Sequence, residues 1–344
     1  MVIFNHCTSG IVGGGKLLTV AKIATGQVMT LSATSMFFLI SGYLFFRNTD
    51  VDNRLIRGIK LKKRFSSLVL PYLLWNAAAL LMVFLLSLYS HSEIGIHGIK
   101  DLFSQFWCCN MWNKNNVNIL GISMPMYGPI DLPLWYLRDL IVITFLSPVV
   151  LFLLKRIGIV FLLLLAPLFV FNIWVPTPGL SSQAVLFWTT GAFFAIRKKD
   201  VQDINSLPST IKFILSIVTL GIFIWAIILS YGGNNPLLYN ILWRLFTIMM
   251  VCCLIIVYPV INRCLSGLPN MFKESTFFVY ALHAIPIIGP VAFLRGKELM
   301  FNSEIAQTAC FFVIPFLVYL ICSLCYITSK KVFPRLTSVF VGGR

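Results

Sequence analysis

Apolar positions fill nine long runs along the chain, and short polar segments separate these runs. A helix that crosses the hydrocarbon core of a bilayer needs about 20 mostly apolar residues. The run at 31–46 is short, and the run at 180–196 contains several Ser, Thr and Gln residues. The pattern predicts membrane-spanning helices over 31–46, 69–89, 133–154, 157–175, 180–196, 212–230, 237–261, 276–294 and 306–328.

The first ten residues have the composition of the end of a further helix, which would be the tenth. Ten helical residues rise only about 15 Å, whereas the hydrocarbon core is about 30 Å thick. The segment therefore cannot span alone, which predicts either a start upstream of Met1 or a truncated chain. It also lacks the basic flank and the cleavage site of a signal peptide. We expect an all-α, polytopic transmembrane bundle of about ten helices, the first of them incomplete.

The composition excludes a water-soluble globular protein. Hydrophobic residues make up 58% of the chain, charged residues 11%, and the mean hydropathy is +0.89. This leaves too little polar surface to cover a soluble domain. Because no long polar linker divides the apolar runs, residues 1–344 are predicted to form a single membrane domain.

The formal charge of +16 reflects topology and not nucleic-acid binding, because Lys and Arg gather in short loops beside apolar runs. Of the 27 Lys and Arg residues, nineteen fall on one set of alternate loops and eight on the other. The positive-inside rule places the richer set in the cytoplasm, so the C-terminus lies inside and residues 90–132 lie outside. The richer loops are 47–64, 155–156, 197–212, 263–273 and 330–344.

Ionisable side chains inside the apolar runs are candidates for function, because burying them in a membrane is costly. His6 and His283 each could act as a general base, since a neutral imidazole accepts a hydroxyl proton near neutral pH. An imidazole that is merely hydrogen-bonded to a neighbouring helix is the alternative for both. Arg138 and Asp139 are adjacent on a helix and should point about 100° apart. Arg138 either extends to the interface or contributes to the site, and Arg244 is expected to pack at the interface.

Neither a glycine-rich motif near the N-terminus nor the cysteines indicate a cofactor or metal site. Residues 10–16 satisfy the first seven positions of a phosphate-binding loop, but the eighth is Leu17, where magnesium coordination needs Ser or Thr. The nine cysteines show no zinc-ligand spacing, so no metal is expected. A redox role is conceivable only for Cys108 and Cys109, which fall in the segment predicted to lie outside.

A basic run between residues 54 and 64 is predicted to face the cytoplasm. By itself it is explained by membrane orientation and by contact with anionic lipid headgroups. Its functional alternative is a cationic surface, with Lys62, Lys63 and Arg64, for the phosphates of a cytosolic cofactor such as coenzyme A.

Taken in order, several segments resemble the acyltransferase-3 family of integral-membrane acyltransferases, which includes bacterial O-acetyltransferases that modify surface polysaccharides. These segments extend from residue 1 to about residue 290. They are Met-Val-Ile-Phe-Asn-His at 1–6, Phe-Phe-Leu-Ile-Ser-Gly-Tyr-Leu-Phe at 37–45, the basic stretch closing in Pro-Tyr at 62–75, Leu-Trp-Tyr-Leu-Arg-Asp at 134–139, and Phe-Val-Tyr-Ala-Leu-His at 278–283.

The resemblance implies a ten-helix enzyme of the bacterial inner membrane that takes an acyl group from acyl-CoA, with acetyl as the expected group. The acceptor would be a hydroxyl of a cell-envelope carbohydrate or lipid-linked glycan at or beyond the outer leaflet. The family's catalytic histidine maps onto His6. We assign the base to His6, a structural or electrostatic part to Arg138, a supporting part to His283, and donor binding to Lys62, Lys63 and Arg64.

Two positions depart from the family pattern. The family often has an arginine eleven residues before the first-helix histidine, and this chain begins too late to contain one. Many members carry Arg-x-x-Arg in the basic loop, whereas Arg64 is followed three positions later by Ser67. These departures predict a remodelled donor site, and a truly truncated chain would be inactive.

Two other classes remain open from the residues alone. A transporter or flippase for an envelope precursor would also need many helices and a few buried charges, but the sequence shows no internal repeat. A structural subunit of an envelope-synthesis complex is the third class, and the incomplete first helix would suit it.

Overall fold

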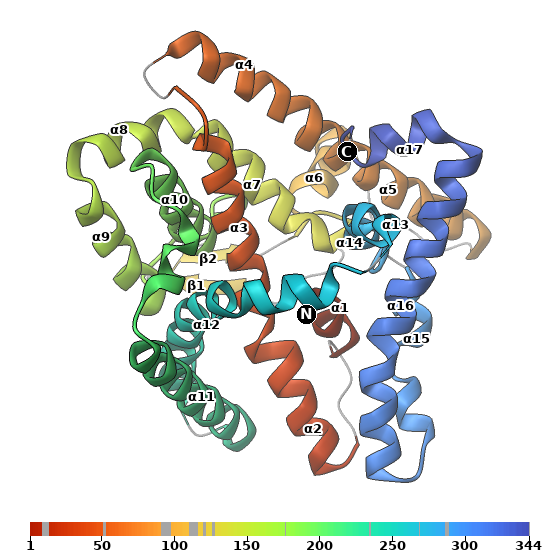
Figure 1. Cartoon of the computed structure of the whole chain (residues 1–344). Coiled ribbons are helices and arrows are strands. Elements are labelled where there is room, and N and C mark those ends of the chain that lie inside the picture. The colour runs from red at the N-terminus through yellow and green to blue at the C-terminus, as the bar shows by residue number, and fades with distance from the viewer. Residues whose placement is uncertain are drawn as a thin grey trace.

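The computed structural model of the chain is built almost entirely of helices (Figure 1). It describes residues 1–8, 14–50, 53–90, 98–109, 116–119, 122–125, 128–175, 177–233, 235–267, 269–285 and 289–343. Among the described residues, a short antiparallel hairpin, in which Asn116 pairs with Pro125, and an isolated bridge between Thr177 and Leu180 interrupt the helical structure. This hairpin lies within the segment that was predicted as an external loop.

The elements follow the apolar runs of the sequence. The first third contains α1 (Val2–Thr8), α2 (Lys16–Lys22), the π-helix η1 (Ile23–Val28), α3 (Thr30–Phe46), α4 (Arg54–Arg64), the π-helix η2 (Phe65–Val69), α5 (Leu70–Ser90) and α6 (Ile99–Trp107). The middle contains β1 (Asn116–Ile119), β2 (Ile122–Pro125), the 3₁₀ turn η4 (Leu132–Leu134), α7 (Trp135–Phe145), α8 (Ser147–Ile157), α9 (Ile159–Val170) and α10 (Ser182–Ile196). The last part contains η5 (Val201–Ser206), α11 (Ser209–Gly232), α12 (Pro236–Leu265), α13 (Asn270–Glu274), α14 (Thr276–Leu282), α15 (Pro290–Leu294), η6 (Lys297–Met300), α16 (Glu304–Val332) and α17 (Pro334–Phe340).

Five helical segments in the described residues are long and apolar enough to cross a membrane, and a bent pair of helices makes a sixth candidate. The prediction of a polytopic helical membrane protein is therefore confirmed. The five segments are Lys16–Phe46, Leu55–Tyr89, Ser209–Gly232, Pro236–Cys264 and Glu304–Val332. The first two are longer than predicted, because a π-helical turn joins α2 to α3 and another joins α4 to α5.

The other predicted spans are bent, short or interrupted. The run at 133–154 bends by 61° between α7 and α8, where Pro148 lacks the N–H that would continue the helix. Helices α9 and α10 have 12 and 15 residues, fewer than a perpendicular crossing needs. The run at 276–294 is not one helix: α14 ends at Leu282 and α15 begins at Pro290. Composition predicted these runs correctly as apolar but could not show where the backbone breaks.

Helices α3 and α10 make the most intimate contact of the fold, near the centre of Figure 1. A Cβ atom at Gly42 would collide with the backbone of Trp188, and one at Gly191 would collide with the backbone of Leu39. Glycine at both positions lets the two backbones approach, as is common between membrane helices. Polar bonds add to this contact, because the Gln183 amide donates to Thr34 Oγ1 at 2.6 Å and to Ser35 Oγ at 3.0 Å.

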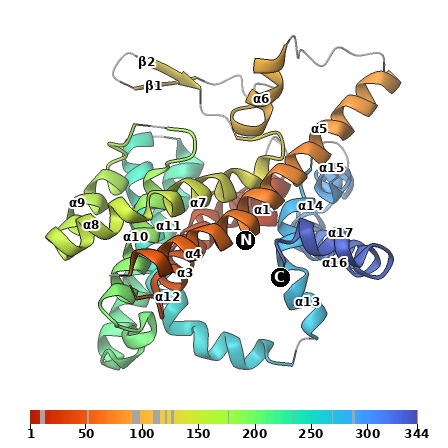
Figure 2. The ribbon, with the colours of Figure 1, turned by 90° about the horizontal axis from the view of Figure 1, so that it is seen from above.

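The short helix α1 lies near the centre of the molecule in both views (Figures 1 and 2). It packs on α16, η1 and α15, and the Phe4 ring contacts the Phe311 ring at 5.7 Å between centroids. Cys7 of α1 belongs to the same apolar cluster as Val279 of α14 and Val291 of α15. This packing holds the N-terminal segment inside the helical bundle, against the two short helices near the C-terminal end.

Candidate active site

Two histidines that are distant in the sequence face each other in the structure. The rings of His6 on α1 and His283 at the end of α14 lie edge to face, with centroids 5.0 Å apart. The His6 residue is 8% exposed and His283 is fully buried. The structure thus brings together two of the three residues predicted to be catalytic.

The backbone of α14 orients the His283 ring. Its Nδ1 lies 3.1 Å from the carbonyl oxygen of Val279 and 2.8 Å from that of Tyr280. Because carbonyl oxygens only accept hydrogen bonds, Nδ1 must carry the proton in these contacts, and Nε2 then has a free lone pair. Nε2 is buried and has no hydrogen-bond partner among the described residues. The arrangement presents an unprotonated imidazole nitrogen beside His6.

A buried ion pair lies close to α1. Lys22 Nζ is 3.0 Å from Glu298 Oε1, and the two side chains are 9% and 1% exposed. Glu298 and Arg295 act electrostatically on Cys7, and Arg295 acts on His6. This pair was not predicted, because Lys22 counts in the sequence only as a topology charge and Glu298 follows no recognisable pattern. A lysine inside the long apolar segment Lys16–Phe46 was the available signal.

Arg138 is buried and does not extend to the interface. Its Nη2 is 3.2 Å from Asp139 Oδ1, and its Nη1 donates to the carbonyl oxygen of Trp107 at 2.6 Å. The guanidinium also lies over the Trp107 ring, 5.5 Å from the centroid. The expectation that Arg138 and Asp139 do not pair is therefore wrong, because the long arginine side chain reaches the neighbouring carboxylate although the two positions diverge on the helix. Asp139 in turn accepts from the backbone N–H of Ser181 at 3.2 Å. The group joins α6, α7 and the start of α10.

Aromatic side chains connect α7 to the histidine pair. The Tyr280 hydroxyl donates to the carbonyl oxygen of Pro133 in η4. The Tyr280 ring lies 6.0 Å from the Tyr136 ring and 6.4 Å from the His283 ring, between centroids. The Tyr136 hydroxyl is 3.3 Å from Ser41 Oγ of α3. The segments 37–45, 134–139 and 278–283, singled out in the sequence, thus meet in one place.

Asp131, at the start of η4, was not predicted as a site residue. It is fully buried, and neither carboxyl oxygen has a hydrogen-bond partner among the described residues. Asp131 lies just outside the candidate span that begins at Leu132, and burial raises the pKa of its carboxyl well above the usual range. The sequence showed only an acidic residue before Leu-Pro-Leu, a pattern that does not distinguish a buried carboxyl from a loop residue.

The basic residues predicted to bind the donor lie at the C-terminal end of α4. Lys62 and Lys63 are exposed and Arg64 is half-buried. Asn53 caps the start of this helix, accepting from the backbone N–H groups of Leu55 and Ile56. Cations in the last turn are favourable because they face the negative end of the helix dipole. Arg64 borders a shallow, mostly apolar surface depression lined by Leu61, Phe65, Leu68, Val69, Ile141, Thr144 and Phe145.

Arg244 lies in the first third of α12 and packs against α9. It donates to the carbonyl oxygen of Phe169 at 3.0 Å and to Asn172 Oδ1 at 2.7 Å, which ties α12 to the end of α9.

The cysteine pair and the motif that resembles a phosphate-binding loop add nothing to this site. Cys108 is half-buried, and the buried Cys109 donates to Gln105 Oε1 at 2.8 Å. Most of the loop-like motif at 10–16 lies outside the described residues.

Comparison with known proteins identifies the class. The sequence profile of the acyltransferase-3 family, described as an acyltransferase domain, matches residues 1–326. The chain belongs to this family of acyltransferase domains, and its described residues include several candidate membrane-spanning helices.

A more specific likeness is distant. The chain is 25% identical over 156 residues to the succinoglycan biosynthesis protein ExoH of Rhizobium meliloti (strain 1021). This match covers 45% of the chain and 38% of that relative, so less than half of either protein is compared. No solved structure matches the chain.

Proposed function

We propose that this protein transfers an acyl group, acetyl in the first instance, from acyl-CoA to a hydroxyl of a cell-envelope carbohydrate or lipid-linked glycan. The observation that carries the proposal is the facing pair His6 and His283, buried among the helices, with the unpartnered Nε2 of His283. Family membership supplies the reaction class. The relative's role in succinoglycan biosynthesis favours a polysaccharide acceptor.

The reaction needs one proton acceptor near the acceptor hydroxyl. As the hydroxyl oxygen bonds to the thioester carbonyl carbon, the hydroxyl proton leaves to a base, the C–S bond breaks, and the sulfur departs with its electron pair and is protonated. We assign the base to His6, and His283 supports it by edge-to-face contact. Arg138 holds α6 against α7 through Trp107 and Asp139. No covalent enzyme intermediate is required, because the thioester is already activated.

Transfer itself is tested with membranes from cells that express the protein and from cells that lack it. We expect a labelled acetyl group to pass from acetyl-CoA to envelope glycan only in the first preparation. Equal labelling of glycan in both preparations would contradict the proposed function.

We expect the double variant Lys63→Gln/Arg64→Gln to bind acyl-CoA about tenfold or more weakly while it uses the glycan acceptor normally. Both side chains reach solvent at the end of α4, where charge-assisted hydrogen bonds to cofactor phosphates would be lost. Binding of acetyl-CoA to purified protein measures the effect. Lys155→Gln/Arg156→Gln, which alters a basic pair in the last turn of α8, is the matched control and should bind normally. If the first variant binds acetyl-CoA with unchanged affinity, the basic residues of α4 serve only to orient the protein in the membrane.

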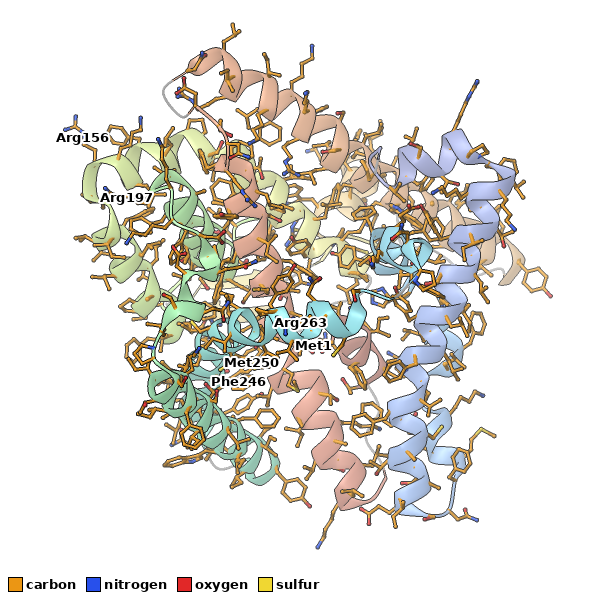
Figure 3. All side chains as sticks on the ribbon, viewed as in Figure 1. Met1, Arg156, Arg197, Phe246, Met250 and Arg263 are labelled. Atoms are coloured by element: carbon orange, nitrogen blue, oxygen red, sulfur yellow. The ribbon has the colours of Figure 1, made fainter. Side chains whose placement is uncertain are left out.

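We place the protein in the bacterial inner membrane with its C-terminus in the cytoplasm. Contacts between distant segments support this orientation, because each contact joins two helix ends that the Lys and Arg count assigns to the same side of the membrane. Leu17 and Glu304 meet on the lysine-poor side, and Glu274 and Lys330 meet on the basic side. Arg156 and Arg197 lie toward the same end of the molecule in Figure 3, and Arg197 lies against Gly158.

Reporter fusions test this orientation. A fusion after Arg344 should report the cytoplasm and one near Asn116 should report the outer side, because the basic loops are retained inside. A cytoplasmic signal from the fusion near Asn116 would reverse the topology.

A further inference from the structure

Asp131 differs from the other buried acids in the described part of the chain. Asp139 pairs with Arg138, and Glu298 pairs with Lys22. The Asp131 carboxyl is equally buried, yet neither of its oxygens has a hydrogen-bond partner there. A buried polar group without a partner is destabilising, so its presence calls for a specific reason.

The donors around Asp131 are already bonded to other groups. Its own backbone N–H donates to Asn76 Oδ1 at 3.2 Å, and the Asn76 amide donates to the carbonyl oxygen of Tyr72 at 2.8 Å. The Tyr72 hydroxyl donates to the carbonyl oxygen of Phe106. On the other side, the Tyr280 hydroxyl donates to the carbonyl oxygen of Pro133. Both phenols are near enough to interact electrostatically with the carboxyl, but neither donates to it. The packing of α5, α6 and α14 thus holds the carboxyl in place and leaves its oxygens for another group.

The position of Asp131 links it to the histidine pair. Tyr280 contacts the turn that Asp131 begins, and its ring lies 6.4 Å from the ring of His283, between centroids. The unpartnered Nε2 of His283 and the unpartnered carboxyl of Asp131 are therefore on elements joined by one tyrosine. Among the described residues these two groups lack partners: one is a hydrogen-bond acceptor beside the proposed base His6, and the other can bind the hydroxyls of an acceptor alcohol.

The chemistry around Asp131 fits a sugar. A carboxyl group can contact two neighbouring hydroxyls of a sugar ring at once, and in its protonated form it both donates and accepts. The Tyr280 ring is near enough to interact electrostatically with this carboxyl and lies 6.0 Å from the Tyr136 ring, and an aromatic ring is a surface on which sugar C–H groups can pack. We propose that Asp131 binds hydroxyl groups of the carbohydrate acceptor and directs the acceptor toward His6 and His283. This inference rests on the proposed function and names one acceptor-binding residue for it.

The test is Asp131→Asn, which preserves side-chain shape and removes the acidic group. In acetyl transfer to envelope glycan extracted from cells that lack the protein, the apparent KM for glycan should rise about tenfold or more, because the amide nitrogen that replaces one carboxyl oxygen cannot accept a hydrogen bond from the second hydroxyl. The KM for acetyl-CoA should stay within about twofold. The melting temperature of the purified variant should stay the same or rise, because an unpartnered acid has been removed. The matched control, Asp139→Asn, should instead lower the melting temperature, because it leaves the buried Arg138 without its anion.

A second readout does not depend on transfer. The same extracted glycan, without acyl-CoA, should raise the melting temperature of the wild-type protein but not that of Asp131→Asn. No shift in the wild type, an equal shift in both proteins, or a lower melting temperature for Asp131→Asn would overturn the assignment of Asp131. A wild-type shift that Asp131→Asn loses, together with no acetyl transfer by the wild type, would support glycan binding at Asp131 while contradicting the proposed reaction.

Discussion

Membranes that carry His6→Ala are expected to transfer acyl groups about 10² to 10⁴ times more slowly than membranes with the wild-type protein, because the proposed general base is gone. The assay is transfer of labelled acyl groups from acyl-CoA to envelope material. Abundance and thermal stability should change little, since the substitution removes a polar ring and little apolar contact. His6 lies against His283 and is 8% exposed, so abundance and melting temperature are measured alongside activity.

The matched control is His283→Ala, which should keep measurable activity if His283 only supports the site. His6→Gln, which fills more of the space left by the ring, separates loss of the base from loss of packing. Should His6→Ala retain more than about a tenth of the wild-type rate, the assignment of the base is wrong. His283 would then be the better candidate, because its Nε2 is buried and unpartnered among the described residues.

Glu298→Ala is expected to lower the free energy of unfolding by about 3–5 kcal/mol, because it leaves the buried Lys22 ammonium without its anion. Thermal melting of the purified protein in detergent measures the loss. The double variant Lys22→Met/Glu298→Leu should recover most of it, since two apolar side chains of similar size replace the pair.

The chain offers a matched exposed pair as control. Lys330 Nζ and Glu274 Oε2 are 2.6 Å apart, but these side chains are 53% and 48% exposed. Glu274→Ala should therefore cost no more than about 1 kcal/mol. If Glu298→Ala and Glu274→Ala lower the free energy of unfolding equally, burial of the Lys22–Glu298 pair does not increase its contribution to stability.

The sequence pointed to individual ionisable residues more readily than to the side chains that surround them. His6 and His283 stood out because an imidazole within an apolar run is costly to bury, and that cost is visible in the run itself. Asp131 and Glu298 did not stand out, because each lies between helices where polar residues are common. Their burial depends on side chains from other elements, such as Tyr72 and Tyr280 around Asp131.

Predictions from helix geometry were also wrong where a long side chain could reach beyond its own position. Helix periodicity predicts that Arg138 and Asp139 diverge, yet the guanidinium reaches back to the adjacent carboxylate and onward to Trp107. The α7–α8 bend shows the same limit for the backbone. Pro148 was visible in the sequence, but the 61° angle depends on how the two helices pack.

The sequence by itself determined that this is a helical membrane protein, because the free energy of placing a segment in lipid depends mainly on its own composition. It also determined the family, through motifs spread along most of the chain. Only the tertiary structure decided which ionisable groups meet. The contact between His6 and His283, the pairing of Lys22 with Glu298 and the isolation of Asp131 each require segments from distant parts of the chain to pack together. No local pattern encodes such contacts, because they arise from the packing of many helices at once.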